Sequence, residues 1–273
     1  MFYRYTQSGA RAAVDLDGLY AGESLFLLGG SPDLNDLPLD LLKNPGVITM
    51  GMNNVPCVFK PNLWICADKP HCFSPHIYAS PEITKFTPIS RCEAAVPGTA
   101  KRVRQFPGFF FFGATEKFTY QNFLDPHRDL VWWLSVFPMA LQLAHRLGFS
   151  RVFLVGCSFC MSKNPGEQYA WNTNLTEDQA QYSHNTYSRD VDRIKGLLPA
   201  FQRKKFCLVS CTPYSAAHEL IPYVPLADAV AEVTETKPQI ADTTTLLHSS
   251  EFKKPQPAAP APAPAPAPDP AGV

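Results

Sequence analysis

The segment Ser24-Leu-Phe-Leu-Leu-Gly-Gly-Ser-Pro-Asp-Leu34 decides the fold of this chain. Its apolar residues run straight into Gly29-Gly30-Ser31, and a short continuous apolar run is typical of a buried parallel strand. Glycines at the end of such a strand let a ligand approach the backbone closely. Asp33 is positioned to cap a following helix, whose free N–H groups favour an anionic ligand such as a phosphate. The segment predicts a nucleotide-binding turn, with an ordinary glycine-containing strand–helix turn as the alternative.

The rest of the chain alternates between strand and helix patterns. Because strand–helix–strand units with right-handed crossovers build parallel sheets, we expect an α/β fold, a Rossmann-like, doubly wound and mostly parallel sheet. Expected strands cover residues 24–29, 47–50, 63–67, 84–89, 109–112, 151–156 and 205–210, and expected helices cover 33–43, 132–147, 187–202 and 215–220.

Domain limits follow from changes in composition. Residues 1–226 are expected to form one nucleotide-binding transferase domain, and the irregular, proline-containing stretch 79–107 is expected to carry an inserted loop or lid. Residues 227–273 are polar and then alternate between Ala and Pro, a composition that cannot bury a core. We therefore expect this segment to be a disordered or semi-rigid tail.

Charge and hydropathy narrow the class of protein. The formal net charge is zero, whereas surfaces that bind duplex nucleic acid usually carry a basic excess, so we expect no duplex partner. Neither a signal-peptide pattern nor an apolar run long enough to span a bilayer is visible. These features predict a soluble, cytoplasmic protein, and they leave a homo-oligomer open.

Eight cysteines are present, several of them within apolar runs, which predicts free thiols packed as small hydrophobic side chains. Cys66, His71, Cys72 and His76 do not have the paired short spacings of a zinc site, so no metal site is predicted. Cys157-Ser-Phe-Cys160 has redox-motif spacing but follows a strand late in the chain, which disfavours a thioredoxin-like site.

A series of motifs resembles one superfamily. In order they are Leu27-Leu-Gly-Gly-Ser-Pro-Asp-Leu34, Gly51-Met-Asn-Asn54, Pro61-Asn-Leu-Trp-Ile-Cys-Ala-Asp68, Val152-Phe-Leu-Val-Gly156 and Gln168-Tyr-Ala-Trp-Asn172. The series is similar to that of bacterial CMP-sialic acid-dependent sialyltransferases, motility-associated glycosyltransferases and archaeal 6-hydroxymethylpterin pyrophosphokinase-like proteins. The resemblance covers about residues 24–226 and implies a Rossmann-like transferase.

The resemblance assigns nucleotide binding to residues after the first two strands, namely Gly29, Gly30, Ser31, Asn53 and Asn54. Ser31 replaces the second family glycine, and Gly30 stands where the sialyltransferases have asparagine. Of two family tyrosines that stabilise the departing phosphate, the later matches Tyr169 and the earlier falls at Cys160. Tyr182-Ser-His-Asn-Thr-Tyr-Ser188 keeps the first family histidine as His184 but has Ser188 at the position of the catalytic one.

Sugar transfer needs a phosphate cradle, a group that offsets charge on the leaving phosphate, and a base for the acceptor hydroxyl. The turn at Gly29 supplies the first, and Tyr169, Tyr187 or Arg189 can supply the second. His184 is the proposed base, and Asp68 would flank the reacting centre. Each has a structural alternative: a surface histidine, a ring covering the sheet edge, an ordinary asparagine turn, or a carboxylate that caps a loop.

Three hypotheses follow. The first is a glycosyltransferase using a nucleotide-activated sugar, such as a CMP-sugar, and an unknown acceptor, with catalytic residues His184, Tyr169 and Asp68 and with no required cofactor. The second is a pyrophosphokinase acting on a small heterocycle, which would need ATP and Mg²⁺ held by carboxylates such as Asp68. The third is a non-catalytic nucleotide-binding or structural module tethered by its tail.

Overall fold

The segment Ser24–Leu28 forms β3, a central strand that is buried on both of its faces. In this computed structural model the described residues are all except 7, 118, 163, 165, 172–174 and 236–273. Successive side chains of a strand point to opposite faces. Leu25 and Leu27 therefore join one hydrophobic core while Phe26 and Leu28 join another.

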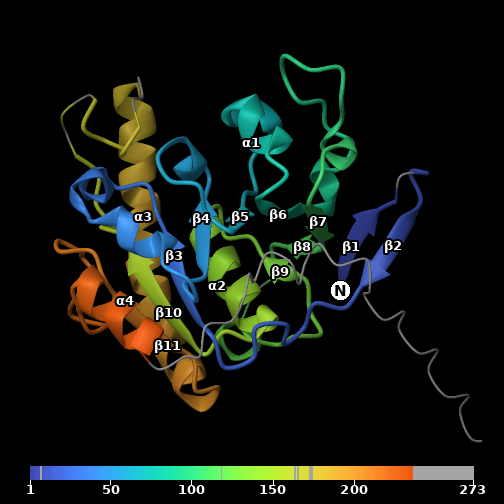
Figure 1. Cartoon of the computed structure of the whole chain (residues 1–273). Coiled ribbons are helices and arrows are strands. Elements are labelled where there is room, and N and C mark those ends of the chain that lie inside the picture. Colours follow the sequence, from blue (N-terminus) through green and yellow to red (C-terminus); the bar gives the residue numbers. More distant parts are fainter. Residues whose placement is uncertain (7, 118, 163, 165, 172–174, 236–273) are drawn as a thin grey trace, which may run out of the picture.

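The main sheet has nine strands in the order β11-β10-β3-β4-β5-β6-β7-β1-β2, so β11 and β2 form its two edges (Figure 1). The seven strands from β11 to β7 are parallel, and the N-terminal hairpin β1–β2 adds to β7 in antiparallel orientation. The expected doubly wound, mostly parallel sheet is confirmed. The strands are β1 (Phe2–Tyr5), β2 (Arg11–Val14), β3 (Ser24–Leu28), β4 (Thr49–Met52), β5 (Leu63–Ile65), β6 (Thr84–Pro88), β7 (Phe109–Phe112), β10 (Arg151–Val155) and β11 (Cys207–Ser210), with β8 (Ala114–Thr115) and β9 (Leu130–Val131) forming a separate parallel pair.

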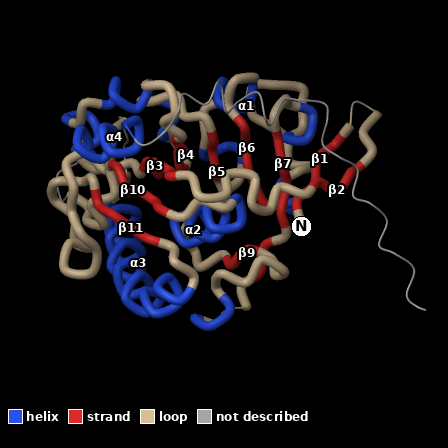
Figure 2. Tube along the Cα trace, turned by 60° about the horizontal axis from the view of Figure 1, so that its bottom comes forward, coloured by secondary structure: helices blue, strands red, loops and turns tan. Residues whose placement is uncertain are grey.

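Helices cover both faces of the sheet, as Figure 2 shows. The helices α2 (Val136–Leu147) and α3 (Glu177–Arg203) pack on the face that carries Leu25 and Leu27. The opposite face is covered by α4 (Leu226–Glu235) on the β10–β11 side and by α1 (Pro75–Ala79) on the β5–β7 side. Short 3-10 helices complete the layers: Pro32–Asp36, Leu39–Lys43, Val55–Cys57, Pro70–Cys72, Ile89–Arg91, Val103–Gln105 and Tyr120–Asn122.

The side of the sheet to which new strands are added changes at β3. From β3 the chain adds β4, β5, β6 and β7 on one side, and it then returns through α2 to place β10 on the other side of β3. In open parallel sheets, ligands bind beyond the carboxyl ends of the strands at such a switch point. Here Gly29 directly follows β3 and Gly156 directly follows β10.

Several expected elements differ from the structure. The helix expected at 33–43 is two 3-10 helices, because Pro38 keeps the preceding Leu37 out of helical geometry, at ψ 147°. The helix expected at 187–202 begins ten residues earlier, at Glu177, and residues 215–220 form turns rather than a helix. The expected C-terminal stop at Gly148 is confirmed, since this residue caps α2 at φ 97°.

The folded part of the chain extends beyond the expected end at Leu226. Helix α4 buries Leu226, Ala229, Val230 and Val233 against the β10–β11 side of the sheet, and this spacing is typical of a helix with one apolar face on a core. The alternating Ala and Pro residues of the expected tail lie outside the described residues. The stretch 79–107 contains β6 and an irregular loop whose Val96, Val103 and Phe106 are buried in the third core cluster.

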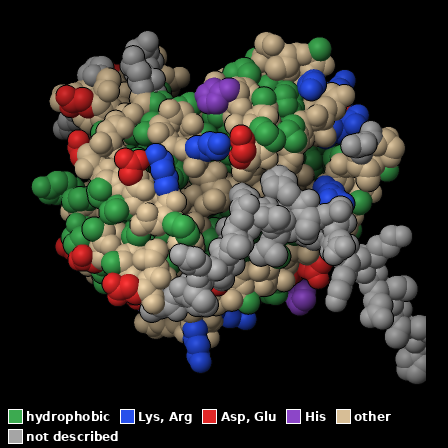
Figure 3. Space-filling view, in the orientation of Figure 1, with side chains coloured by type: hydrophobic (Ala, Val, Ile, Leu, Met, Phe, Trp, Pro, Cys, Tyr) green, Lys and Arg blue, Asp and Glu red, His purple; other side chains and the backbone are tan. Residues whose placement is uncertain are grey.

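The face drawn in Figure 3 mixes acidic and basic side chains, and the outline of the molecule dips between the α3 side and the α1 side. Within the described residues, no helix has the length and apolar character needed to cross a membrane. All eight cysteines are free thiols, and four of them are buried: Cys66, Cys92, Cys157 and Cys211.

Candidate functional site

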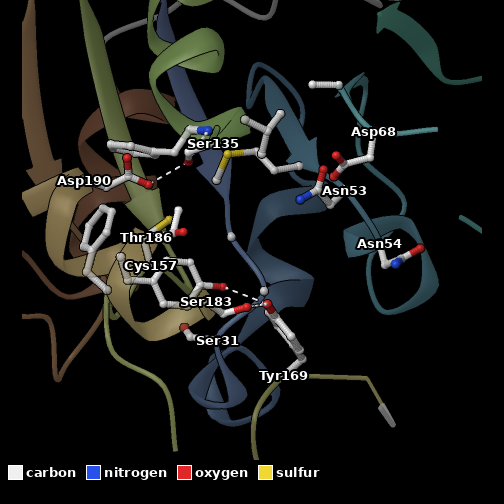
Figure 4. A pocket seen from close by; sticks show the side chains of 18 of the residues that line it. Ser31, Asn53, Asn54, Asp68, Ser135, Cys157, Tyr169, Ser183, Thr186 and Asp190 are labelled. Carbon is white, nitrogen blue, oxygen red and sulfur yellow. Dashed lines mark hydrogen bonds between the residues drawn. The ribbon is translucent and has the colours of Figure 1, made fainter. Parts of the chain in front are cut away.

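A cavity of about 400 Å³ lies at the switch point, at the carboxyl ends of β3, β4, β5 and β10. Its size falls in the range of pockets that hold small molecules and cofactors. One wall comes from these strand ends, and the other comes from the start of α2, from α3 and from the loop after β10. Figure 4 shows the two walls facing each other. Of the residues proposed from the sequence, all but His184 and Arg189 line this cavity: Gly29, Gly30, Ser31, Asn53, Asn54, Asp68, Tyr169 and Tyr187.

The glycine turn is used differently from the expected phosphate cradle. The backbone N–H of Gly29 donates to the Val155 carbonyl at 2.8 Å, and that of Ser31 donates to the Gly156 carbonyl at 3.0 Å. These two amides therefore have protein acceptors and are not free for a phosphate. Asp33 does not cap a helix by its side chain; its carboxylate accepts the Ser31 hydroxyl, and burial raises the pKa of this carboxyl.

Glycine is needed in this turn for close packing within the protein. A Cβ on Gly29 would lie 2.7 Å from the Cys157 Sγ and even closer to the Gly156 carbonyl oxygen. A Cβ on Gly30 would overlap the indole ring of Trp171. We expected a ligand to approach these two Cα atoms closely. Gly156 and Cys157, which follow β10, and Trp171 occupy that position instead.

Asn53, Asn54 and Asp68 project from the ends of β4 and β5. Asn53 has a left-handed backbone, at φ 51°, which asparagine tolerates better than most residues. Its main chain is fixed, since the Asn53 carbonyl accepts the indole N–H of Trp64 at 2.6 Å, while its Oδ1 is buried without a hydrogen-bond partner among the described groups. An unsatisfied buried acceptor in a cavity wall is suited to a ligand donor. Asp68 is exposed at the rim.

Hydroxyl groups form a chain along the opposite wall. The Tyr187 hydroxyl donates to the Tyr169 hydroxyl at 3.2 Å, and that of Tyr169 donates to Ser183 Oγ at 3.5 Å. Burial, with Tyr169 next to it, raises the pKa of Tyr187 well above its usual value, so this phenol stays protonated and can donate. The Tyr169 ring is stacked on Trp171, with 5.0 Å between centroids. Tyr187 therefore places a second tyrosine hydroxyl beside that of Tyr169 in the cavity.

A buried carboxylate lies at the base of the same wall. Asp190 on α3 is 1% exposed and lines the cavity. Its Oδ2 accepts the Ser135 hydroxyl at 2.7 Å, and its Oδ1 accepts Arg193 Nη1 at 2.6 Å. Burial raises the pKa of Asp190 to about 6, whereas the bonds from Ser135 and Arg193 act in the opposite direction. The carboxyl is thus set to gain and lose a proton near neutral pH.

The turn that begins α2 is fixed by this carboxylate and its partner. Ser135 caps the helix by accepting the Phe137 N–H, and Arg193 Nη2 donates to the Trp133 carbonyl at 2.7 Å. The guanidinium of Arg193 also lies over the Trp133 ring, 4.7 Å from its centroid. Between these anchors Leu134 is held in a left-handed conformation, at φ 59°, and is exposed at the cavity wall. Such strain in a non-glycine residue persists only where its surroundings enforce it.

His184 does not reach the cavity. It lies within the first half of α3 and is exposed, whereas Ser183, Thr186, Tyr187 and Asp190 share the face of the helix that lines the cavity. Because each residue turns an α-helix by about 100°, His184 is rotated by about that angle from its neighbour Ser183 and away from this face. Cys160 and Arg189 are exposed as well, and neither lines the cavity. The loop at 79–107, expected as a lid, contributes no described residue to the lining.

Two sequence signals point to the residues that we did not predict. Thr176-Glu-Asp-Gln179 is a capping box, which marks the true start of α3. Asp190 interrupts an apolar series at helical spacing, Tyr187, Ile194, Leu197 and Phe201, so it is a charged residue on a buried face. A charge at such a position is a candidate functional group.

The charges that line the cavity are acidic. Asp68 and Asp190 are part of the lining, and among the described lining residues there is no Lys, Arg or His. In the part of the chain that the structure describes, no group of three or more His, Cys, Asp or Glu is arranged to hold a metal ion. Neutral donors, the asparagine amides and the tyrosine and serine hydroxyls, are therefore the groups available to a bound anion here.

Comparisons with known proteins give similarity to solved structures alone. No protein-family model matches the chain, and no curated protein matches it. The sialyltransferase CstII from Campylobacter jejuni, in complex with a substrate analogue, cytidine-5'-monophosphate, superposes with a TM-score of 0.41 at 14% identity over 75% of this chain and 86% of that one. A structure of the sialyltransferase CST-II with trisaccharide acceptor and CMP gives 0.38 at 16% identity over 74% and 86%. The interpretation of the cavity rests on the residues of this chain.

Proposed function

We propose that this chain is a glycosyltransferase that takes its sugar from a nucleotide-activated donor, a CMP-sugar in the form that the motif resemblance implies. One observation carries the proposal: separate segments after β3, β4, β5 and β10 converge on one cavity at the switch point of the sheet. Folds of this class bind nucleotides at that point. Three of these segments carry residues that the sequence analysis proposed for the site: Gly29–Ser31 after β3, Asn53 and Asn54 after β4, and Asp68 after β5.

The nucleotide is proposed to lie against the strand-end wall. Asn53 offers a buried acceptor without a partner to an N–H or O–H of the base or ribose. The leaving phosphate is proposed to accept the Tyr169 O–H, which turns to it from its long 3.5 Å contact with Ser183, while Tyr187 donates to the Tyr169 oxygen at 3.2 Å. Preorganised neutral donors aimed at developing charge are a common way to stabilise a leaving group. The proposal assigns no resident cofactor.

Ligand-induced stabilisation tests the proposal, because a ligand that binds only the native state raises the melting temperature. CMP, UMP and ATP with Mg²⁺ are compared on wild type, Asn53→Gly and His184→Ala. Glycine keeps the backbone geometry at position 53 while removing the amide. We expect CMP to raise the melting temperature of wild type and His184→Ala, and to raise that of Asn53→Gly much less.

Two outcomes contradict the proposal. If no nucleotide raises the melting temperature, the cavity does not serve a nucleotide-dependent transferase. If only ATP with Mg²⁺ does so, and the effect is lost in Asp68→Asn, the pyrophosphokinase hypothesis replaces the glycosyltransferase. The exposed Asp68 carboxylate at the cavity rim is the observation that favours this second candidate.

A further inference from the structure

The sequence leaves the reaction without a base inside the cavity, since His184 lies on another face of α3. We propose that Asp190 is the general base that takes the proton of the acceptor hydroxyl, with Ser135 and Arg193 as positioning residues. This inference rests on the proposed function. It also places the acceptor at the wall formed by the start of α2 and by α3, opposite the strand ends.

Geometry is the first support. Asp190 lines the cavity, and each of its two oxygens accepts one hydrogen bond of 2.6–2.7 Å from a neighbouring side chain. A carboxylate has about four lone-pair sites, so each oxygen keeps one for a further donor. Figure 4 shows Asp190 joined to Ser135 on the wall opposite Asn53 and Asp68. An acceptor hydroxyl between the walls can therefore donate to Asp190 while its oxygen faces the donor sugar.

Rigidity is the second support. Arg193 holds Asp190 and the Trp133 carbonyl together, and Ser135 holds Asp190 and the Phe137 N–H together. The carboxylate is thus fixed from two helices. A base on a rigid element keeps the productive orientation without reordering during the reaction.

The groups that face Asp190 determine its titration. Arg193 contributes the neighbouring positive charge from α3, and the Ser135 hydroxyl approaches from the start of α2. Tyr187 on α3 and Cys157 after β10 also interact with it, and burial raises the pKa of both above their usual values, so both remain neutral near pH 7. Burial of Asp190 itself outweighs Arg193 and brings its pKa to about 6, where a general base is effective.

The acceptor O–H bond breaks and its proton moves to Asp190, while the acceptor oxygen forms a bond to the anomeric carbon of the donor. The bond between that carbon and the phosphate oxygen breaks, and its electron pair leaves with the nucleotide. Asp190 then returns its proton to solvent.

The test compares variants on one helix. Wild type, Asp190→Asn and His184→Asn are assayed between about pH 5 and about pH 8. The assay measures nucleotide release from CMP-, UDP- and GDP-sugars with lactose as the acceptor, and CMP binding is measured in parallel. We expect wild-type kcat/KM to rise with pH through a midpoint near 6. Asp190→Asn should lose roughly 10²- to 10⁴-fold in kcat with CMP affinity unchanged, and His184→Asn should match wild type.

Ser135→Ala keeps the test decisive if Asp190→Asn does not fold. Removing a hydrogen bond that lowers the pKa of Asp190 should move the activity midpoint to higher pH, a shift that a purely structural serine would not cause. Full activity in Asp190→Asn, or an unmoved midpoint in Ser135→Ala, overturns the inference and leaves the transferase standing. A wild type that binds CMP but transfers from none of the donors overturns the proposed function, and this inference with it.

Discussion

The two walls of the cavity are built in opposite ways. The strand-end wall around Gly29 is made by backbone: its amides bond to the neighbouring strand, and its glycines allow close packing with Gly156 and Trp171. The helix wall around Asp190 is made by side chains, which form an ion pair, a serine cap and a chain of hydroxyls. One wall fixes the shape of the site, and the other carries its titratable chemistry.

This difference shows where function can be sought in a parallel sheet. A glycine turn at a switch point indicates the location of a site, but amides of the turn, here those of Gly29 and Ser31, can be used by the fold itself. Groups that gain and lose protons need burial and charged partners, which helices that pack over the strand ends can provide. The walls should therefore respond differently to substitution and to pH.

The largest effect is expected for Arg193→Met. Removing one partner of a buried ion pair leaves an uncompensated charge, so the free energy of unfolding should fall by about 3 kcal/mol at pH 7. The loss should shrink below pH 6, because Asp190 is then protonated in both proteins. Chemical denaturation at the two pH values measures this. Arg189→Met, an exposed position on the same helix, should change stability by less than about 0.5 kcal/mol; equal losses in the two variants would show that the pair does not stabilise the helix wall.

The pH dependence of wild-type stability should carry the signature of Asp190. Its pKa is about 6 in the folded chain against an ordinary 3.8, so between these values the folded state holds a proton that the unfolded state has released. The free energy of unfolding therefore falls as pH rises through this window, by at most about 3 kcal/mol. Asp190→Asn lacks this contribution. The difference in the free energy of unfolding between wild type and Asp190→Asn should grow from about pH 4 to about pH 6 and stay constant above. A difference that does not change with pH would contradict a raised pKa of Asp190.

On the strand-end wall, Gly29→Ala should destabilise by about 1–3 kcal/mol at every pH, since the added Cβ meets a backbone carbonyl that cannot move aside. Gly30→Ala should cost less, because its Cβ meets the Trp171 side chain. Thermal unfolding ranks the two. A smaller loss for Gly29→Ala than for Gly30→Ala would mean that the close contact at the switch point is not the constraint on this turn.

The smallest effect is expected for Tyr187→Phe, which removes one hydroxyl from the chain but keeps the ring. Losing its hydrogen bond to Tyr169 should cost about 1 kcal/mol in stability. If the two tyrosines face the leaving phosphate, CMP affinity should drop as well, by roughly tenfold. Calorimetric titration with CMP checks this, with Tyr214→Phe as the control, since Tyr214 is exposed and is not among the described residues that line the cavity.

Much of the fold follows from the sequence, because buried parallel strands leave a strong signal. The runs at 24–28, 109–112 and 151–155 are apolar on both faces and were predicted nearly to the residue. The hairpin β1–β2 was missed because its residues are mostly exposed or half-buried and lack clear alternation. The first half of α3 was missed because it is polar, and α4 because it follows a proline-containing stretch that reads as the end of the domain.

The site was predictable on one wall. Residues after strand ends must meet at one edge of the sheet, so Asn53, Asn54 and Asp68 could be brought together from strand positions alone. Asp190 could not be predicted as a site residue, because its role depends on which face of α3 packs against the start of α2. It also depends on burial that only tertiary packing creates. The position of His184 could not be predicted for the same reason. It is close to Asp190 in the sequence, but the helix turns it away from the cavity.

A crystal structure with CMP tests the central claim most directly. The account predicts CMP in the switch-point cavity, with a phosphate oxygen within hydrogen-bond distance of the Tyr169 or Tyr187 hydroxyl, an atom of the nucleoside at Asn53 Oδ1, and the helix wall at Asp190 open to an acceptor. CMP bound elsewhere, or a cavity that remains empty at saturating CMP, would contradict it.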